Sequence, residues 1–118
     1  MELSFRPPAV VWSTNADRTM HWAKRSKIVK AWRETACFEC RAAGIKDLDP
    51  SLLRFELPFA RGGRRDPMNY VGTVIKAMVD GLVEAGCWPD DTGEFVEVRQ
   101  PMLVVGGDGL VVISFSPL

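Results

Sequence analysis

The chain has 118 residues, the size of one domain with a small hydrophobic core. Its 47% hydrophobic and 25% charged residues are typical of a globular protein, and it has no repeats and no low-complexity tract. No apolar run approaches the roughly 20 residues of a membrane span and no signal peptide is visible, so we expect a cytoplasmic protein.

The charges are unevenly distributed, although the formal net charge is zero. Residues 1–65 hold 13 Lys/Arg and 7 Asp/Glu, whereas residues 66–118 hold 2 and 8. A basic region can bind an anionic polymer, and an acidic region can hold a metal ion. Two halves that simply attract each other would show the same asymmetry, so the charges alone leave both interpretations open.

Three cysteines, Cys37, Cys40 and Cys87, are an odd number without a secretory context, which predicts reduced thiols. Cys37 and Cys40 have the CxxC spacing of zinc and redox sites, but no second pair follows, and His21 is the only histidine. We therefore interpret the cysteines as buried helix residues.

The amino-terminal part predicts a strand, a loop and a long helix. Residues 9–12 are apolar and follow two prolines, which predicts a first strand. Residues 13–17 are polar and rich in capping residues, which predicts the loop into a helix over residues 19–43 that ends at Gly44. The expected apolar stripe of that helix comprises Trp22, Val29, Trp32, Ala36, Cys40 and Ala43.

Basic residues crowd the first half of this helix and are expected to face outward. They are Lys24, Arg25, Lys27, Lys30 and Arg33, and Arg18, His21 and Trp22 adjoin them. Such a run is commonly a solvated face. Mixed with aromatic side chains, it also suits a phosphate backbone.

The middle of the chain predicts a strand followed by a basic loop. Residues 52–59 alternate, which places Leu53, Phe55, Leu57 and Phe59 on one apolar face. Residues 61–65 then read Arg-Gly-Gly-Arg-Arg. The glycines let a ligand approach the backbone, and Arg61, Arg64 and Arg65 suit phosphate, although an ordinary surface turn needs nothing more.

A second helix is predicted over residues 70–85. Apolar residues at positions 71, 74, 75, 78, 79 and 82 recur at spacings of three and four and so mark one helical face. At about 100° per residue, Asn69, Lys76 and Asp80 fall on the opposite face. Gly86 is expected to end the helix, and Pro89 prevents its continuation.

The remaining residues predict three further elements. Residues 95–99 begin a strand, Pro101 indicates an edge position or a bulge, and residues 102–105 continue it. Residues 106–109 predict a hairpin turn before a last strand over residues 110–115. The order β-α-β-α-β-β predicts one small α/β (α+β) domain, with a mixed sheet packed by two helices.

Acidic residues flank the second predicted helix, with Asp66 before it and Asp90 and Asp91 after it. Carboxylates that leave positions for water and phosphate can hold Mg²⁺, which supplies much of what phosphodiester hydrolysis needs. Lys76 can neutralise the scissile phosphate or orient water, and Asp80 is either an outer metal ligand or a helix salt-bridge partner of Lys76. Each flanking acid also has an ordinary role: Asp66 as a helix N-cap, Asp90 and Asp91 as turn formers.

These residues carry a resemblance to a known family. The block Arg64-Arg65-Asp66, Asn69, Lys76-Ala77, Asp80-Gly81-Leu82, Ala85-Gly86 and Trp88-Pro89-Asp90-Asp91 resembles the signature of RusA-type crossover junction endodeoxyribonucleases, or Holliday junction resolvases. Asn15, Arg18, His21-Trp22 and Trp32-Arg33 are similar to the leading segment of phage-borne members, so the matches extend over most of the chain.

The resemblance implies a small homodimer that binds four-way DNA junctions and cuts them with Mg²⁺, or with Mn²⁺ in its place. It implies a role in DNA recombination and repair, and a phage or prophage gene expressed in the cytoplasm of a bacterial host. The catalytic residues would be Asp66, Lys76 and Asp91, and the metal-binding acids Asp66 and Asp91, with Asp90 adjacent. The DNA-binding residues are expected to be Arg18, His21, Lys24, Lys27, Lys30, Arg61, Arg64, Arg65 and Asn69.

The chain departs from the family pattern in two places. Met68 stands where the bacterial pattern has a second aspartate, and the segment between Asp66 and Lys76 is about four residues longer. Either Asp80 or Asn69 completes the metal shell, or the site is weakened and the protein binds branched DNA with little cleavage. A more distant alternative is an interaction protein whose charge asymmetry drives self-association, which predicts no affinity for nucleic acid.

Overall fold

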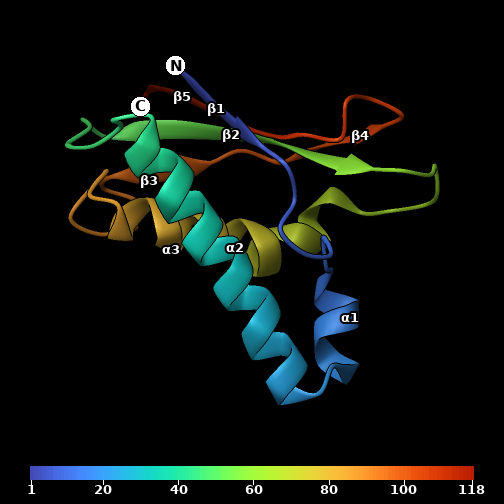
Figure 1. The fold of residues 1–118 in the computed structure, drawn as a ribbon. Coiled ribbons are helices and arrows are strands. Elements are labelled where there is room, and N and C mark those ends of the chain that lie inside the picture. Colours follow the sequence, from blue (N-terminus) through green and yellow to red (C-terminus); the bar gives the residue numbers. More distant parts are fainter.

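One mixed β-sheet and a layer of helices beneath it make up the fold (Figure 1). The computed structural model describes residues 1–118. The strands are β1 (Glu2–Phe5), β2 (Ser51–Phe59), β3 (Val96–Val98), β4 (Met102–Val105) and β5 (Val111–Pro117). In the sheet β1 pairs with β5 and β5 with β2, both antiparallel, and β2 pairs with β3 and β4 in parallel. The predicted fold class, a mixed sheet with helices packed on it, is confirmed.

The central strand β2 shows why the helices cover only one face of the sheet. Leu53, Phe55 and Leu57 are buried, while Arg54 among them is exposed. The helices cover one face of the sheet (Figure 1). Since successive side chains of a strand point to opposite faces, the alternation in the sequence dictates one covered and one open face.

One edge of the sheet is shared by two short strands. β3 pairs with Ser51 to Leu53 and β4 with Glu56 to Phe59 of the same strand, so the edge is interrupted between them. Pro101 lies in this interruption, and a proline has no N–H to donate to a neighbouring strand. The prediction of an edge or bulge at this proline is confirmed.

The first strand lies earlier in the chain than predicted. Residues 9–12 form no strand, because Pro7 and Pro8 end the ladder of β1 and β5. The segment crosses the helices instead: the Val10 carbonyl accepts a hydrogen bond from Trp32 Nε1 (3.0 Å), and the Trp12 carbonyl accepts one from Thr73 Oγ1 (2.7 Å).

Two helices stand where one was predicted. Part of the predicted loop forms α1 (Thr14–Thr19), because Ser13 caps it and accepts a hydrogen bond from the Ala16 N–H at 3.2 Å. The long helix α2 (Trp22–Ala42) begins later than predicted, after its N-cap His21, and ends before Gly44, whose φ is +71°.

The apolar stripe predicted for α2 is wrong at both ends. Trp22 is 76% exposed and Ala43 is exposed as well. The residues that are buried are Ile28, Trp32, Ala36, Cys37 and Cys40. A stripe is buried only where another element packs against it, and the first turns of α2 extend beyond the rest of the domain (Figure 1).

The second predicted helix is observed as a continuous helical run in which three types of helix follow one another. A 3₁₀-helix η1 (Pro67–Tyr70) leads into a π-helix η2 (Val71–Ile75) and then into α3 (Lys76–Glu84). Gly86 follows with a φ of +99°, which confirms the predicted end. The expected common face of Asn69 and Lys76 assumed about 100° per residue, a rotation that neither the 3₁₀ nor the π segment has.

Helices α2 and α3 pack against each other at very short range. A Cβ added to Gly81 would lie 2.3 Å from the Arg33 carbonyl oxygen and 3.1 Å from the Ala36 Cβ. Only glycine allows this approach. The interface continues into the core beneath the sheet through Trp32, Met78 and Leu82, all fully buried. None of the helices combines the length and the apolar character that crossing a membrane requires.

Candidate functional site

Three of the predicted site residues form one cluster at the surface of α3. Lys76 lies in the first turn, and its Nζ is 2.9 Å from Asp80 Oδ1 one turn later. The same Nζ donates a hydrogen bond to Asp91 Oδ2, from the loop that follows the helix. The salt bridge between Lys76 and Asp80 is one of the two roles predicted for Asp80, and the resemblance implied that Lys76 and Asp91 belong to one site.

The loop that carries Asp91 is anchored by a tryptophan. Trp88 is buried beneath the sheet and stacks on Phe115, with ring centroids 6.2 Å apart. Its Nε1 donates to Ser51 Oγ at 3.2 Å and to the Asp49 carbonyl at 3.3 Å. A residue three positions after such an anchor has little freedom, so the place of Asp91 beside α3 is a consequence of core packing.

The cluster stabilises the charged state of its members. Hydrogen bonds with Asp91 and then Asp80 raise the pKa of Lys76 above its ordinary value of 10.5. The hydrogen bond from Lys76 lowers the pKa of Asp91 below 3.8, against a smaller opposing effect of burial. Lys76 is therefore an ammonium and Asp91 a carboxylate throughout the neutral pH range.

Asp90 has the turn-forming role that was one of its two predicted roles. Its Oδ1 accepts a hydrogen bond from the Asp91 N–H at 2.6 Å, which fixes the backbone before the second aspartate. Its side chain is exposed. The surface around Lys76 thus holds one ammonium and the three carboxylates of Asp80, Asp90 and Asp91, an excess of negative charge that attracts cations.

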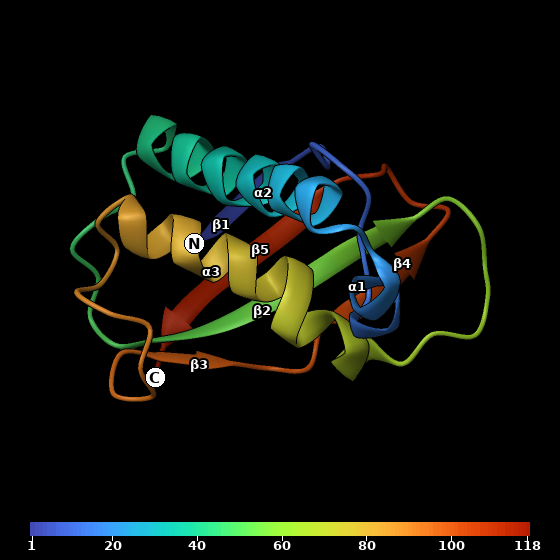
Figure 2. The ribbon, with the colours of Figure 1, turned by 90° about the horizontal axis from the view of Figure 1, so that it is seen from below.

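Asp66 lies apart from this cluster. It caps η1, and its Oδ1 accepts a hydrogen bond from the Met68 N–H at 3.0 Å, as the N-cap interpretation predicted. The 3₁₀-helix η1 and the π-helix η2 lie between Asp66 and the first turn of α3, and the loop after α3 begins at the far end of this helical run (Figure 2). Asp66 makes no hydrogen bond or salt bridge with Lys76, Asp80 or Asp91. Accordingly, no three His, Cys, Asp or Glu side chains form a group that could hold a metal ion.

The donor chemistry near Lys76 nevertheless fits Mg²⁺. This ion retains several waters and is commonly held by one or two carboxylates together with substrate phosphates, rather than by a complete set of protein ligands. Asp90 and Asp91 are adjacent exposed or half-exposed carboxylates, and Asp80 is a third nearby. Asp80 and Asp91, which contact Lys76, and Asp90 beside Asp91 would each contribute at most a partial set of ligands, which waters and substrate phosphates would complete.

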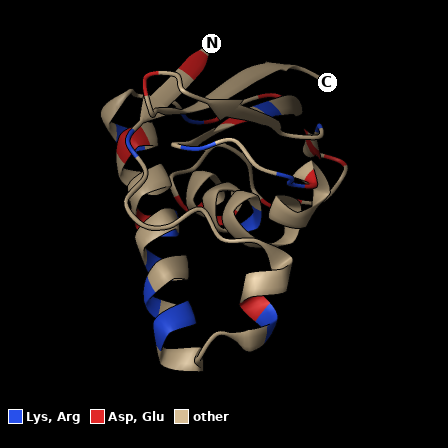
Figure 3. Ribbon diagram, turned by 90° about the vertical axis from the view of Figure 1, so that its right-hand side faces the viewer, with Lys and Arg blue, Asp and Glu red and all other residues tan.

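The predicted DNA-binding residues of the first helix lie on a projecting arm, which we define as α1 and the first half of α2. Lys and Arg residues are concentrated in this part of α2 (Figure 3). Arg18, Lys24 and Lys27 are exposed and make no ion pair, and Lys30 pairs only loosely with Glu34, at 3.8 Å. The exposure expected for these residues is confirmed.

Asp17, a residue without a predicted role, holds the arm together. Asp17 Oδ1 accepts hydrogen bonds from Trp12 Nε1 at 3.0 Å and from Arg25 Nε at 2.6 Å, which ties α1 to α2. The bond from Trp12, and to a smaller extent that from Arg25, lowers the pKa of Asp17. Sequence spacing gives no signal for a contact of this kind.

The loop of arginines lies at the same end of the molecule as the arm (Figures 1 and 2). Arg61 and Arg64 are exposed. Arg65 is more fixed: its guanidinium lies 4.1 Å from the Phe59 ring centroid and donates to the Arg61 carbonyl at 3.0 Å. The Asn69 carbonyl accepts a hydrogen bond from Thr14 Oγ1 at 3.0 Å, which joins η1 to α1.

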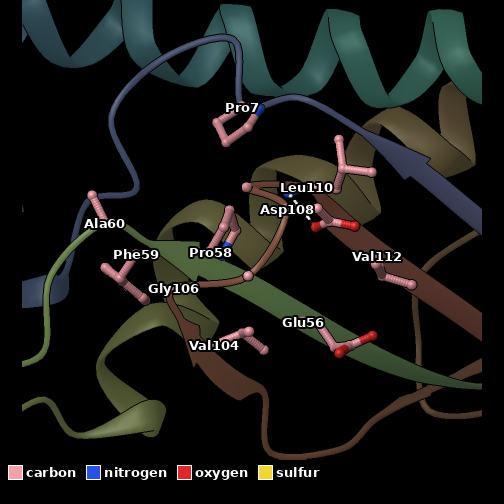
Figure 4. A pocket seen from close by; sticks show the side chains of 12 residues that line it. Pro7, Glu56, Pro58, Phe59, Ala60, Val104, Gly106, Asp108, Leu110 and Val112 are labelled. Carbon is pink, nitrogen blue, oxygen red and sulfur yellow. Dashed lines mark hydrogen bonds between the residues drawn. The ribbon is translucent and has the colours of Figure 1, made fainter.

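The largest surface pocket contains none of the predicted site residues. Its volume is about 570 Å³, and it lies on the open face of the sheet between β2, β4 and the turn before β5 (Figure 4). Two acids, Glu56 and Asp108, line it, and Asp108 accepts a hydrogen bond from the Leu110 N–H at 3.1 Å. The lining has no Lys, Arg or His, so this pocket does not suit a phosphate.

Two of the buried cysteines, which lie far apart in the sequence, are in contact. Cys40 Sγ of α2 and Cys87 Sγ of the loop after α3 are 3.3 Å apart, and all three cysteines are buried free thiols, as predicted.

Comparisons with known proteins do not identify the chain. No model of a protein family matches it, and no curated protein matches it either.

Proposed function

We propose that the protein is a Mg²⁺-dependent endodeoxyribonuclease that binds and cuts four-way junctions or other branched DNA, in recombination and repair. The observation that carries this proposal is the surface cluster of Lys76, Asp80 and Asp91, which combines a phosphate-binding cation with carboxylates of the type that hold Mg²⁺. The resemblance of residues 64–91 to RusA-type endonucleases supports the same conclusion.

In this mechanism Lys76 stabilises negative charge on the oxygens of the scissile phosphate. Asp80 and Asp91 hold its ammonium group from two sides, so that the group is oriented before DNA arrives. Mg²⁺ held beside Lys76 would supply a nucleophilic water and further charge stabilisation. Asp90 and Asp91, with Asp80, are the residues that would hold the ion.

DNA binding would rest on the arm and the arginine loop. The exposed Arg18, Lys24 and Lys27 have no acidic partners and are free to contact phosphates. Arg61 and Arg64 extend the basic surface at the same end of the molecule. A homodimer follows from the proposal, because a four-way junction presents two equivalent strands and each chain carries a single cluster.

The second candidate is a structure-selective DNA-binding module without catalysis. Two observations favour it: Met68 stands in the place of an acid, and Asp66 lies apart from the other carboxylates. This candidate keeps the role of the basic arm and assigns Asp66, Asp90 and Asp91 only to the turns and the helix cap in which they lie.

The test is to incubate the purified protein with four-way junction, flap and plain duplex DNA, with Mg²⁺, with Mn²⁺ and with a chelator. The endonuclease predicts metal-dependent cuts near the branch and no cutting of the duplex. Binding to the junction without any cutting would establish the second candidate. Sedimentation in the same buffer tests the dimer, and a monomer at micromolar concentration would contradict it.

A further inference from the structure

The tip of the arm carries an exposed aromatic pair. Trp22 is 76% exposed, whereas Trp12, Trp32 and Trp88 are all at most 3% exposed. The His21 ring stacks on the Trp22 ring, with centroids 5.6 Å apart and planes at 29°. Burial of a tryptophan side chain stabilises a folded protein. An exposed indole that stacks on a second ring therefore needs an explanation.

The surroundings of Trp22 are cationic. A shallow surface pocket of about 270 Å³ next to it is lined by Trp22, Arg25, Ser26, Val29, Lys30 and Arg33. This lining includes three cations and no acid. Each of these three cations has an acidic partner outside the lining, Asp17 for Arg25, Glu34 for Lys30 and Glu84 for Arg33. Lys24 and Lys27, on the same half of the helix, have no acidic partner. The charge therefore favours a polyanion with flat groups over an apolar protein surface.

The flat groups that Trp22 can contact in such a polyanion are nucleobases with at least one face free of stacking. In an intact duplex the base faces are covered by their neighbours, whereas an unpaired nucleotide exposes a face that an aromatic side chain can cover. Proteins that bind single strands combine such aromatic platforms with a basic groove along the backbone. The arm has both parts within about three turns of one helix.

We propose that Trp22, with His21 behind it, stacks on an unpaired nucleobase, and that the adjoining pocket of Arg25, Lys30 and Arg33 binds phosphates of the same strand. The inference rests on the proposed DNA-binding function and adds the feature of the DNA that the arm selects: unpaired nucleotides, as at a branch point. Binding of this kind favours branched over plain duplex DNA without reading sequence.

The chain offers a matched control on the same helix. Phe38 is 69% exposed, but its surroundings include the acids Glu34 and Glu84 with a single cation, Arg41. Its removal changes an exposed aromatic residue outside the arm. Trp22→Phe supplies the second control, because it keeps a ring that can stack.

The first experiment measures binding of labelled oligothymidylate and of a blunt duplex of equal length by fluorescence anisotropy, in a chelator so that no DNA is cut. Trp22→Ala should bind oligothymidylate about 5- to 150-fold more weakly, the effect of losing one base–aromatic stack. Duplex binding should stay as in wild type, Trp22→Phe should retain most of the affinity, and Phe38→Ala should match wild type. Equal weakening of both DNAs by Trp22→Ala, or no weakening, would overturn the proposal.

The second experiment uses intrinsic fluorescence, because Trp22 is the only exposed tryptophan. Oligothymidylate should quench part of the wild-type emission, and this quenching should disappear in Trp22→Phe. Unchanged quenching in that variant would overturn the proposal.

The outcomes separate the two proposals. Quenching by oligothymidylate in a protein that never cuts a junction would support the stacking platform and contradict the endonuclease. Junction cutting that Trp22→Ala leaves intact, together with unchanged binding of oligothymidylate, would contradict the platform and leave the endonuclease standing.

Discussion

The two halves of α2 differ more than their shared helical structure suggests. Beyond Trp32 the helix packs against α3 at Gly81, where the two backbones nearly touch, and Ala36 and Cys40 are fully buried. Before Trp32 only Ile28 is buried, and the helix leaves the domain together with α1 (Figure 1). One continuous helix thus belongs to the core at one end and to the surface arm at the other.

Because of this difference, substitutions that change stability and substitutions that change recognition are expected in different halves of α2. Substitutions in the packed half act through cavities or overpacking, and substitutions in the arm change only charge and exposed surface. The Lys76 cluster belongs to the packed part, because α3 and the loop anchored by Trp88 position it. Chemistry, affinity and stability are therefore expected to respond to different substitutions.

The largest effect is expected from Asp91→Asn, on cleavage. The change keeps the shape of the side chain but removes the charge that would hold Mg²⁺, so junction cutting should fall by several orders of magnitude. Metal-free binding should persist or tighten, because one charge that repels phosphate is lost. Rates of cutting and the melting temperature are measured together, so that unfolding is not mistaken for lost chemistry.

Asp108→Asn is the control for that variant, because Asp108 is likewise an aspartate in a turn but lies before β5 and makes no contact with Lys76. It should cut junctions at the wild-type rate. Near-normal cutting by a folded Asp91→Asn protein would remove Asp91 from the mechanism and leave it only the role of a turn former.

The next effect concerns the arm and is expected in affinity alone. Replacing Lys24, Lys27 and Lys30 with Ala should weaken binding to all DNA sequences alike. The slope of log affinity against log salt should flatten by about 0.9 for each lost phosphate contact with duplex DNA, and thus by up to about three units. Binding is titrated at several salt concentrations, with Lys46→Ala as a control outside the arm.

The melting temperature of the triple variant should remain close to that of wild type, since all three lysines are exposed. If the salt slope does not change, this face of the helix is only solvated, and the division between arm and body loses its functional meaning.

A stability effect of intermediate size is expected at Gly81. The added methyl group of Gly81→Ala would meet the Arg33 carbonyl oxygen at 2.3 Å, so α2 and α3 must move apart. Overpacking of this kind costs about 1–3 kcal/mol of the free energy of unfolding. Urea unfolding should show a lower midpoint with an unchanged slope.

Gly72→Ala is the matched control, because a Cβ there would have no heavy atom within 4 Å. It should be neutral or slightly stabilising, since alanine loses less backbone entropy on folding. A Gly81→Ala protein as stable as wild type would show that the two helices are not held at the short distance described.

Much of the sheet and of the helices packed on it, which form the body of the domain, could be predicted from the sequence. Less of the arm could be predicted. The alternation of β2 and the spacing of apolar residues between positions 71 and 82 are local patterns, which is why both elements were located correctly. The stripe of α2 was extended to Trp22 wrongly, because periodicity identifies a helical face but not where its packing partner ends.

The candidate site shows a similar limit. The pair of Lys76 and Asp80 follows from a spacing of four residues, and the return of Asp91 follows from the turn at Gly86 and the resemblance in that block. The position of Asp66 could not be predicted, because the 3₁₀ and π segments between it and Lys76 change the rotation per residue. The contact of Cys40 with Cys87 depends on the packing of α2 beside α3, which no local pattern reveals.

The smallest effect is expected in the pH dependence of stability. Because Lys76 lowers the pKa of Asp91 below 3.8, the pair stabilises the folded state fully above that value, and the contribution is lost as the pH falls through the lower folded pKa. Lys76 gives the opposite limit: its raised pKa keeps the contribution present below 10.5 and removes it as the pH rises further. At neutral pH both conditions are met.

Since the Lys76 side chain is 52% exposed, the pair is worth only about 0.2–1 kcal/mol. Wild type should thus exceed Asp91→Asn in urea midpoint at pH 7 and lose that advantage as the pH falls below 4. Asp17→Asn repeats the measurement in the arm, where hydrogen bonds from Trp12 and Arg25 lower the pKa of the aspartate in the same direction. A difference between wild type and Asp91→Asn that does not change with pH would mean that the two side chains make no ion pair in solution, and that Lys76 is not oriented before DNA binds.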